Sequence, residues 1–351
     1  MKKLPNIKAV DLFCGAGGLT HGLVRGGIKV VAGVDLDPQC RYPFEANNDA
    51  TFFEEDVGTL TADRLRKLYG RDGLRLLAGC APCQPFSTYS RSGRNPRYEQ
   101  EWPLVSSFGR LVEDLKPDLV TMENVPQLAD HSVFLEFLSS LSDYRVWWDV
   151  VDCAKFGVPQ TRQRLVLMGS KLGARAPSLG EGSHVAKSVR ETIAQLPPLP
   201  AGGIDPEDNL HISSKLSPIN LKRIRASMPG GTWRDWDEEL LAACHRKATG
   251  ATYPSVYGRM EWDKPSPTIT TQCFGFGNGR FGHPEQDRAI SLREAAMLQT
   301  FPRDYEFVPK GGRVVFDKLG RLIGNAVPVR IGEVIADALV NHVMDTWREA
   351  A

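Results

Sequence analysis

The sequence predicts an α/β protein with a doubly wound, mostly parallel sheet and a second, smaller irregular domain. The first 170 residues alternate short apolar runs with helix-like stretches, which is the pattern of a parallel sheet covered by helices. After Gly169, glycine, proline and serine interrupt every periodicity, as in GSKLGARAPSLGEGSH. We therefore expect one domain from residues 1–170 together with 322–351, and a second domain from 171–321.

The expected elements follow the chain in order. The apolar runs predict strands at 8–13, 29–34, 74–79, 118–122, 146–152 and 165–169. One helix is expected from about Gly17 to the Gly26-Gly27 pair, and another over 104–115, just before Pro117. Helical spacing returns at 292–300 and at 329–347, and we expect the last helix to pack on the first domain.

Composition excludes several classes of protein. The chain has 351 residues, of which 42% are hydrophobic and 24% charged, so disorder, collagen and coiled coil are excluded. No run approaches the roughly 18 apolar residues of a membrane span, and we expect a soluble cytoplasmic protein. The net charge is +1 and the seven cysteines are scattered, which favours reduced thiols and leaves room for a local basic face.

A glycine-rich turn follows the first expected strand. In DLFCGAGGLTHG, residues 11–22, the glycines permit a tight turn whose N–H groups approach a ligand closely. The turn departs from G-x-G-x-x-G because Thr20 stands in the third position. Asp35 follows about 20 residues beyond the glycines, the spacing of an acid that binds ribose hydroxyls. Asp56 ends a further apolar stretch, where an adenine contact and a solvated strand-end acid both remain open.

A thiol and a carboxylate follow two further strands. Cys83, in GCAPCQPFS, lies just beyond the expected strand 74–79, where ligands bind in open α/β sheets. Zinc binding by Cys80 and Cys83 would need a second ligand pair, which the sequence lacks, so we expect no metal. A thioredoxin-like dithiol belongs at a helix N-terminus, whereas Pro82 and Pro85 indicate a rigid extended loop here. The alternative is a buried inert cysteine. Glu123, in ENV, ends the next strand, so we expect its side chain to face the same pocket.

Basic residues stand out in three places. In QTRQR, Arg162 and Arg164 share one face if the chain is extended, with ordinary surface arginines as the alternative. The stretch after Cys83 resembles a mobile loop, with an ordinary surface loop as the alternative, and it contains Arg91, Arg94 and Arg97. Residues 212–234 contain no acid and suit phosphate contact or form a solvated basic face; their cations are Lys215, Lys222, Arg223, Arg225 and Arg234.

In order and residue type, these motifs closely resemble those of the bacterial DNA (cytosine-5) methyltransferases. The glycine turn, the Pro-Cys-Gln around Cys83, ENV and QTRQR are joined by REAAMLQTF at 293–301 and GNAVPV at 324–329. Only about 170–260 is unmatched in detail. The resemblance implies a Rossmann-like class I methyltransferase fold, the cofactor S-adenosylmethionine, double-stranded DNA as substrate, and a target-recognition role for the second domain.

The resemblance also implies roles for the residues that match its motifs. Cys83 would attack the cytosine, Glu123 would bind N3 and the exocyclic amine, and Arg164 would hold O2 with support from Arg162. Toward the cofactor, Phe13 would stack on the adenine, Asp35 would hold the ribose in place of the commoner Glu, Asp56 would meet the adenine amine, and Asn325 would approach the methionine end. Further cofactor contacts would come from Cys14, Gly15, Ala16, Gly17, Leu36, Val57, Pro82 and Val327.

DNA contacts and partners follow in the same way. Beside the basic residues Arg91, Arg94, Arg97, Lys222, Arg223 and Arg225, the DNA contacts would include Gln84, Ser87 and Tyr89. The alternatives are a tRNA cytosine-5 methyltransferase, a catalytically silent DNA-binding relative, and a small-molecule methyltransferase, which would leave the second domain without a purpose. A cognate restriction endonuclease or a repair nuclease is the partner protein that this family implies.

Overall fold

The structure, a computed structural model, describes residues 5–82, 103–182, 185–247, 250 and 252–350. The chain forms two compact units. The first comprises Met1–Phe156, Gln163–Ser183 and Val327–Ala351, and the second comprises Gly157–Arg162 and His184–Ala326. The predicted boundaries at 170 and 322 thus differ from the observed ones at 183 and 326, and the short segment 157–162 joins the second unit.

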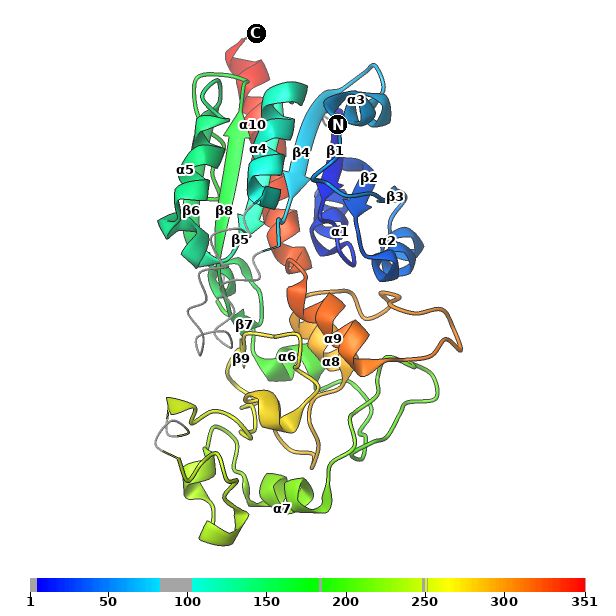
Figure 1. The fold of residues 1–351 in the computed structure, drawn as a ribbon, viewed down its shortest axis with the longest axis vertical. Helices are drawn as coiled ribbons and strands as arrows, with labels where there is room; N and C mark the ends of the chain where they lie inside the picture. The colour runs from blue at the N-terminus through cyan, green and yellow to red at the C-terminus, as the bar shows by residue number, and fades with distance from the viewer. Residues whose placement is uncertain (1–4, 83–102, 183–184, 248–249, 251, 351) are drawn as a thin grey trace. The chain divides into compact units, whose positions relative to one another are not determined.

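A seven-stranded sheet forms the centre of the first unit, in the order β3-β2-β1-β4-β5-β8-β6 (Figure 1). Strand β8 is antiparallel to both β5 and β6, and the remaining neighbouring pairs are parallel. The mostly parallel sheet predicted from the alternating pattern is therefore confirmed. The strands are β1 (Ile7–Leu12), β2 (Lys29–Asp35), β3 (Thr51–Glu54), β4 (Leu74–Gly79), β5 (Leu119–Asn124), β6 (Arg145–Asp152) and β8 (Gln163–Ser170).

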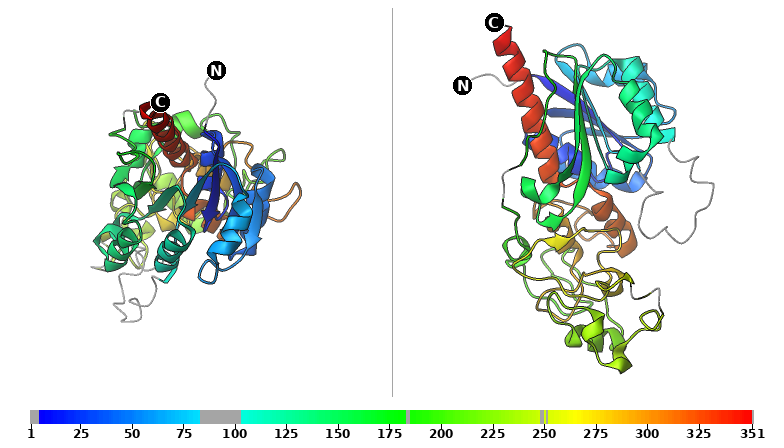
Figure 2. Two further views of the ribbon diagram at one scale, coloured as in Figure 1. Left: turned by 90° about the horizontal axis from the view of Figure 1, so that it is seen from above. Right: turned by 90° about the vertical axis from the view of Figure 1, so that its left-hand side faces the viewer.

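Helices cover both faces of this sheet. On one face α1 packs against the long helix α10, and on the other α3, α4 and α5 lie side by side (Figure 2). Because both faces are covered, the central strands are largely buried, and all six residues of β5 are buried. The helices are α1 (Gly18–Arg25), α2 (Arg41–Asn47), α3 (Ala62–Tyr69), α4 (Pro103–Leu115), α5 (Ser132–Ser139) and α10 (Val329–Glu349).

Close contact between α1 and α10 depends on glycine. A Cβ atom built on Gly22 would lie 2.3 Å from the carbonyl oxygen of Val329 and 2.6 Å from the Cα of Gly332. A Cβ on Gly332 would in turn lie 2.9 Å from the carbonyl oxygen of Leu19. The backbones of the two helices therefore touch here, which confirms that the C-terminal helix packs on the first unit.

The carboxyl ends of four neighbouring strands meet at one edge of the sheet. Leu12 of β1 pairs with Val34 of β2 and with Gly79 of β4, and Gly79 pairs with Met122 of β5. The side chains that follow these residues therefore lie along the same edge. Among the residues that the sequence predicted for cofactor binding and catalysis, Phe13, Asp35 and Glu123 lie at these strand ends.

The second unit contains little regular structure around a small apolar core. Strands β7 (Gln160–Thr161) and β9 (Ser266–Pro267) form a parallel pair. Its helices are α6 (Val189–Ile193), α7 (Pro218–Ala226), α8 (Leu292–Leu298) and α9 (Phe316–Asn325). Trp233, Trp236, Phe276 and Ile224 form a buried cluster, and a buried ion pair joins Arg288 to Glu294 with two 2.7 Å contacts.

Short 3-10 helices complete both units. In the first unit they are η1 (Pro38–Cys40), η5 (Pro126–Asp130) and η6 (Cys153–Phe156). In the second unit they are η7 (Trp233–Asp235), η8 (Glu238–Leu240) and η10 (Phe276–Asn278). The part of the chain that the structure describes contains no helix long and apolar enough to cross a membrane.

Candidate active site

The glycine-rich turn between β1 and α1 adopts an unusual backbone conformation. Phe13, Gly15 and Gly17 have φ angles of 57°, 53° and 87°. The amide of Cys14 donates to the carbonyl of Val34 at 3.2 Å, which ties the turn to the end of β2. These left-handed residues reverse the chain within a few residues, so the turn lies directly over the carboxyl edge of the sheet.

Asp35, the last residue of β2, holds this turn. One carboxylate oxygen accepts from the amide of Gly15 at 2.9 Å, and the other accepts from the amide of Asp37 at 2.9 Å. The acid and the glycine turn are thus brought together, as their spacing indicated. Leu36, the next residue, leaves 66% of its surface exposed beside them.

The turn also contains a buried carboxyl group that sequence reasoning missed. Asp11 of β1 is only 1% exposed, and one of its oxygens accepts from the Thr20 hydroxyl at 2.6 Å. Its other oxygen, Oδ1, has no hydrogen-bond partner among the described residues. Burial raises the pKa of Asp11 to about 7, with a smaller contribution from the charge of Asp35.

These features fit the cofactor that the sequence implies. No atom lies within 4 Å of the position that a Cβ would occupy on Gly15, so the turn leaves open space beside Asp35. The buried Asp11 oxygen supplies an unused hydrogen-bond acceptor, and the exposed Leu36 supplies an apolar surface. To bind a nucleoside that carries a positively charged chain, a site needs an accessible backbone turn, an acidic group and an apolar surface.

Other predicted cofactor residues differ in their surroundings. Phe13 is half-buried against the core, and Ala16 and Val57 are buried. Asp56 is exposed, and its carboxylate accepts from the amide of Gly58 at 2.8 Å. Pro82 is exposed at the end of the described segment. The contacts of Asp56 thus lie within its own turn.

Glu123 lies at the end of β5 on the same sheet edge. It is 2% exposed, and its Oε1 lies 3.0 Å from Nε of Arg164, which extends from the antiparallel neighbour β8. Its Oε2 accepts from the Cys80 thiol at 2.9 Å. The structure therefore brings together Glu123, Arg164 and the start of the segment that leads to Cys83; strand order had predicted that Glu123 and Cys83 face one pocket, and Cys83 itself lies outside the described residues.

The prediction that Arg162 shares one face with Arg164 assumed a single extended strand. Arg162 lies between β7 and β8 rather than within one strand, so the alternation of strand side chains does not apply. Its guanidinium donates to the carbonyls of Ile269 and Ala326, at 3.2 and 3.4 Å, within the second unit. It is 2% exposed and stabilises the loops of that unit.

The remaining predicted residues fall into two groups. Asn325 is the exposed last residue of α9 in the second unit, and Val327 is buried in the first unit. The nucleophile and its loop lie outside the described residues, and these are Cys83, Gln84, Ser87, Tyr89, Arg91, Arg94 and Arg97.

The predicted phosphate contacts on α7 have different environments. Lys222 is exposed. Arg223 donates to the carbonyl of Leu240 at 2.8 Å and lies over the Trp236 and Tyr257 rings, so its guanidinium stabilises the unit internally. Arg225 pairs with Asp287 at 3.1 Å but keeps 62% of its side chain exposed. Sequence reasoning could not identify these partners, because they come from distant loops.

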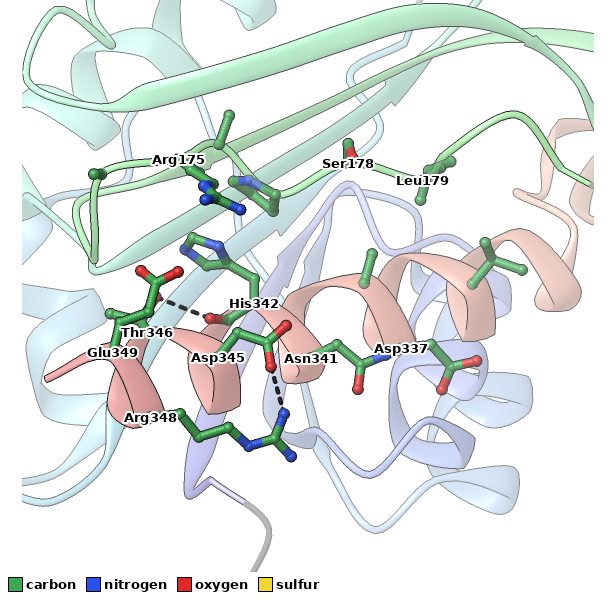
Figure 3. Close-up of a pocket in the computed structure, with 15 residues that line it drawn as sticks. Arg175, Ser178, Leu179, Asp337, Asn341, His342, Asp345, Thr346, Arg348 and Glu349 are labelled. Atoms are coloured by element: carbon green, nitrogen blue, oxygen red, sulfur yellow. Dashed lines mark hydrogen bonds and ion pairs between the residues drawn. The ribbon is translucent and has the colours of Figure 1, made fainter. Parts of the chain in front are cut away.

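A separate cavity of about 590 Å³ lies between residues 174–179 and α10 (Figure 3). Its walls include Arg175, His342, Asp345 and Arg348, and Asp345 pairs with Arg348 at 2.6 Å. Its lining includes none of the residues predicted for catalysis, cofactor binding or DNA contact. Among the described residues, no group of three or more His, Cys, Asp or Glu side chains is arranged to hold a metal ion.

Comparison with known proteins identifies the family. Residues 7–341 match the C-5 cytosine-specific DNA methylases. The chain is 49% identical to the Type II methylase M.HgiDII of Herpetosiphon aurantiacus over 94% of both chains. It is 31% identical to the Type II methyltransferase M1.HphI of Haemophilus parahaemolyticus, over 94% of this chain and 86% of that one.

Solved structures show the same fold. A DNA modification methyltransferase encoded within a prophage (E. coli) superposes with a TM-score of 0.73 at 22% identity. The superposition covers 97% of this chain and 100% of that one. The S. pombe Dnmt2 methyltransferase superposes with a TM-score of 0.61 at 16% identity, covering 97% and 99%. The family match over residues 7–341 and the two Type II relatives establish that this chain belongs to the C-5 cytosine-specific DNA methylases and is a DNA (cytosine-5)-methyltransferase.

Proposed function

We propose that this enzyme methylates C5 of a cytosine swung out of double-stranded DNA, through a transient bond between Cys83 and C6. The observation that carries the proposal is the buried Glu123 carboxylate, paired with Arg164 at 3.0 Å on the edge where the Cys83 segment begins. A buried acid and a cation at a strand end can bind the polar edge of a pyrimidine.

The chemistry explains why the reaction needs these groups. Cytosine C5 is a poor nucleophile because the aromatic ring keeps its electrons delocalised. In the proposed reaction the Cys83 thiolate bonds to C6, and electrons of the C5–C6 double bond move toward N3, where Glu123 supplies a proton or hydrogen bond. C5 then takes the methyl group. Removal of the C5 proton restores the double bond and expels the thiolate.

Arg164 has two proposed tasks in this sequence. Its guanidinium carries a permanent charge and can stabilise the negative charge that develops at O2 when C6 is attacked. Its ion pair with Glu123 also orients the carboxylate before substrate binds. Arg162, held by carbonyls of the second unit, is proposed to act only by supporting the site.

S-adenosylmethionine, which the family implies, supplies the methyl group when bound. We propose that Asp35 binds the ribose hydroxyls, Phe13 and Leu36 contact the adenine, and Asp56 meets the adenine amine. Asp11 is the residue we add, because its Oδ1 is buried without a partner and can accept a hydrogen bond from a cationic ligand group. Cys14, Gly15, Ala16, Gly17, Val57, Pro82, Asn325 and Val327 complete the proposed cofactor site.

DNA binding must offset the cost of extruding the base, which is a few kcal/mol. Phosphate contacts supply most of the affinity of such complexes. We propose that exposed Lys222 and Arg225 on α7 make them, together with Gln84, Ser87, Tyr89, Arg91, Arg94 and Arg97. Arg223 is proposed to act indirectly, since its guanidinium holds Leu240 and the aromatic cluster.

Two relatives named as Type II enzymes suggest the biological setting. We propose that the enzyme marks one short DNA sequence in the bacterial cytoplasm and thereby protects it from a cognate restriction endonuclease.

Sequencing of DNA from a host that expresses the enzyme tests the proposal. Bisulfite or nanopore reads should show 5-methylcytosine at one short motif for the wild type and none for Cys83→Ser. Glu123→Gln keeps the shape but cannot donate a proton, so methyl transfer should fall by about 10²-fold or more. Glu136→Gln, on the exposed face of α5, is the matched control and should be fully active.

Two results would contradict the proposal. One is the absence of 5-methylcytosine on DNA that contains every short motif. The other is methylation of tRNA in place of duplex DNA by the purified protein, which would support the RNA alternative. A duplex with 5-fluorocytosine at the target should remain bonded to the wild-type protein in denaturant and should separate from Cys83→Ser.

A further inference from the structure

We propose that Cys80, the first thiol of the Cys80-Ala81-Pro82-Cys83 segment, is a positioning residue that holds the Glu123 carboxylate for catalysis. This inference rests on the proposed function of Glu123. Its observation is a hydrogen bond of 2.9 Å from the Cys80 thiol to Oε2 of Glu123. Zinc binding and dithiol chemistry were the roles considered for this thiol from sequence, and neither uses that contact.

The two carboxylate oxygens of Glu123 have different partners. Arg164 lies 3.0 Å from Oε1, and the Cys80 thiol donates to Oε2. A glutamate side chain has three rotatable bonds, so one ion pair alone leaves the plane of the carboxylate free to turn. Two partners from two different strands fix that plane, which is what an acid needs to meet a ring nitrogen in one geometry.

The backbone around Cys80 is itself held from both sides. Its amide donates to the carbonyl of Leu12 in β1 at 3.3 Å. On the other side, the Asn124 side chain donates to the carbonyl of Ala81 at 3.0 Å. Asn124 directly follows Glu123 in β5, so the same strand end that presents the acid also clamps the segment that carries the thiol.

A thiol suits this task better than an apolar side chain would. Glu123 is only 2% exposed, so few water molecules can satisfy its oxygens. An S–H group is a weak donor, which allows it to stabilise the resting carboxylate and still yield Oε2 when the cytosine amine arrives as a donor. A stronger donor or a charged group would compete with the substrate for the same oxygen.

Three variants separate hydrogen bonding from packing. Cys80→Ser keeps a donor, Cys80→Ala removes the donor and leaves space, and Cys80→Val fills the space without a donor. The rate of single-turnover methyl transfer should fall by about tenfold in both Cys80→Ala and Cys80→Val, while their affinity for DNA should change less than about twofold. Cys80→Ser should retain most of the wild-type rate. Cys153→Ala, which removes a fully buried thiol from the same unit, should leave the rate unchanged.

The outcomes distinguish this inference from the proposed function. If the wild type transfers no methyl group to DNA, the proposed function fails. If the wild type is active and Ala and Val match it, only the role of Cys80 is overturned. A Ser variant as slow as Ala would also overturn it, because packing alone would then explain the loss. If circular dichroism shows that Cys80→Ala does not fold, the methyl-transfer rates of Cys80→Ser and Cys80→Val are compared instead, and equal rates would overturn the role of Cys80.

Discussion

The buried side chain of Asp11 makes the stability of the folded protein depend on pH. Its carboxyl lies near the end of β1, where Thr20 donates to it, and burial raises its pKa from 3.8 to about 7. The folded protein therefore holds a proton on Asp11 between these pH values, whereas the unfolded chain has released it. Stability from this group is greatest at low pH and falls as pH rises to about 7.

Asp11→Asn should remove this pH dependence. The amide keeps an acceptor for Thr20 but never ionises, so the variant should gain stability relative to the wild type as pH rises from about 4 to 7. Urea unfolding at several pH values in that range measures the difference in the free energy of unfolding. A difference that stays constant with pH would contradict the assignment. Asp56→Asn, at an exposed turn, is the control and should show no comparable trend.

At the same scale, spacing identified some site residues and missed others. Asp35 was found because a ribose-binding acid stands at a fixed distance from a glycine turn, and the structure joins it to Gly15. Cys80 was considered only for metal or dithiol chemistry, because its contact with Glu123 crosses 43 residues of sequence. No local pattern records a contact between two strand ends.

Among the elements, the α1–α10 pair is the most sensitive to side-chain size. Gly22→Ala would by itself favour a helix by about 1 kcal/mol, since glycine is a poor helix former. Its Cβ would, however, collide with the backbone of α10, 2.3 Å from the Val329 oxygen. Overpacking of this kind costs typically 1–3 kcal/mol, and a backbone partner has little room to move.

We therefore expect Gly22→Ala to lower the free energy of unfolding by at least about 1 kcal/mol. Unfolding in denaturant measures this change in the free energy of unfolding. Val24→Ala, two residues further on the exposed side of α1, is the control and should change stability by less than about 0.5 kcal/mol. A stabilised Gly22→Ala variant would show that the helices separate more easily than their contact indicates.

Element boundaries were predictable where apolar runs were long. The strands expected at 29–34 and 74–79 occur as Lys29–Asp35 and Leu74–Gly79. Strand β3 was not assigned as a strand, because four residues flanked by acids carry too little periodicity. The break between β7 and β8 was not predicted for a related reason, because nothing in the QTRQR sequence indicates it. Arg162 lies at this break rather than within a strand.

At the scale of the whole molecule, the fold depends on the order in which the segments follow one another in the chain as well as on their sequences. The first unit takes its last helix from the end of the chain, after the long excursion through the second unit. Helix α10 buries Ile331, Ile335, Leu339 and Val343 in the first unit. Without it, the apolar face of α1 and one side of the sheet would be exposed to water.

Removal of residues 327–351 should therefore prevent stable folding of the first unit. Four large apolar side chains each contribute about 1.5–3 kcal/mol when buried, which is comparable to the whole stability of a domain. Removal of 345–351 alone should be tolerated, because Thr346 is half-buried and the other described residues from 345 to 350 are exposed. Near-UV circular dichroism and limited proteolysis report the outcome; a native-like product lacking 327–351 would contradict this account.

The sequence alone determined the class of fold and the family, and it predicted the acids and the thiol for which we propose roles in the chemistry. Periodicity and short motifs record these because each depends on residues close together in the chain. Only the tertiary structure decided that Cys80 and Arg164 contact opposite oxygens of Glu123, that Asp11 is buried without a second partner, and that Arg162 belongs to the second unit. Those contacts join distant segments, and burial and pairing arise only when the strand ends come together.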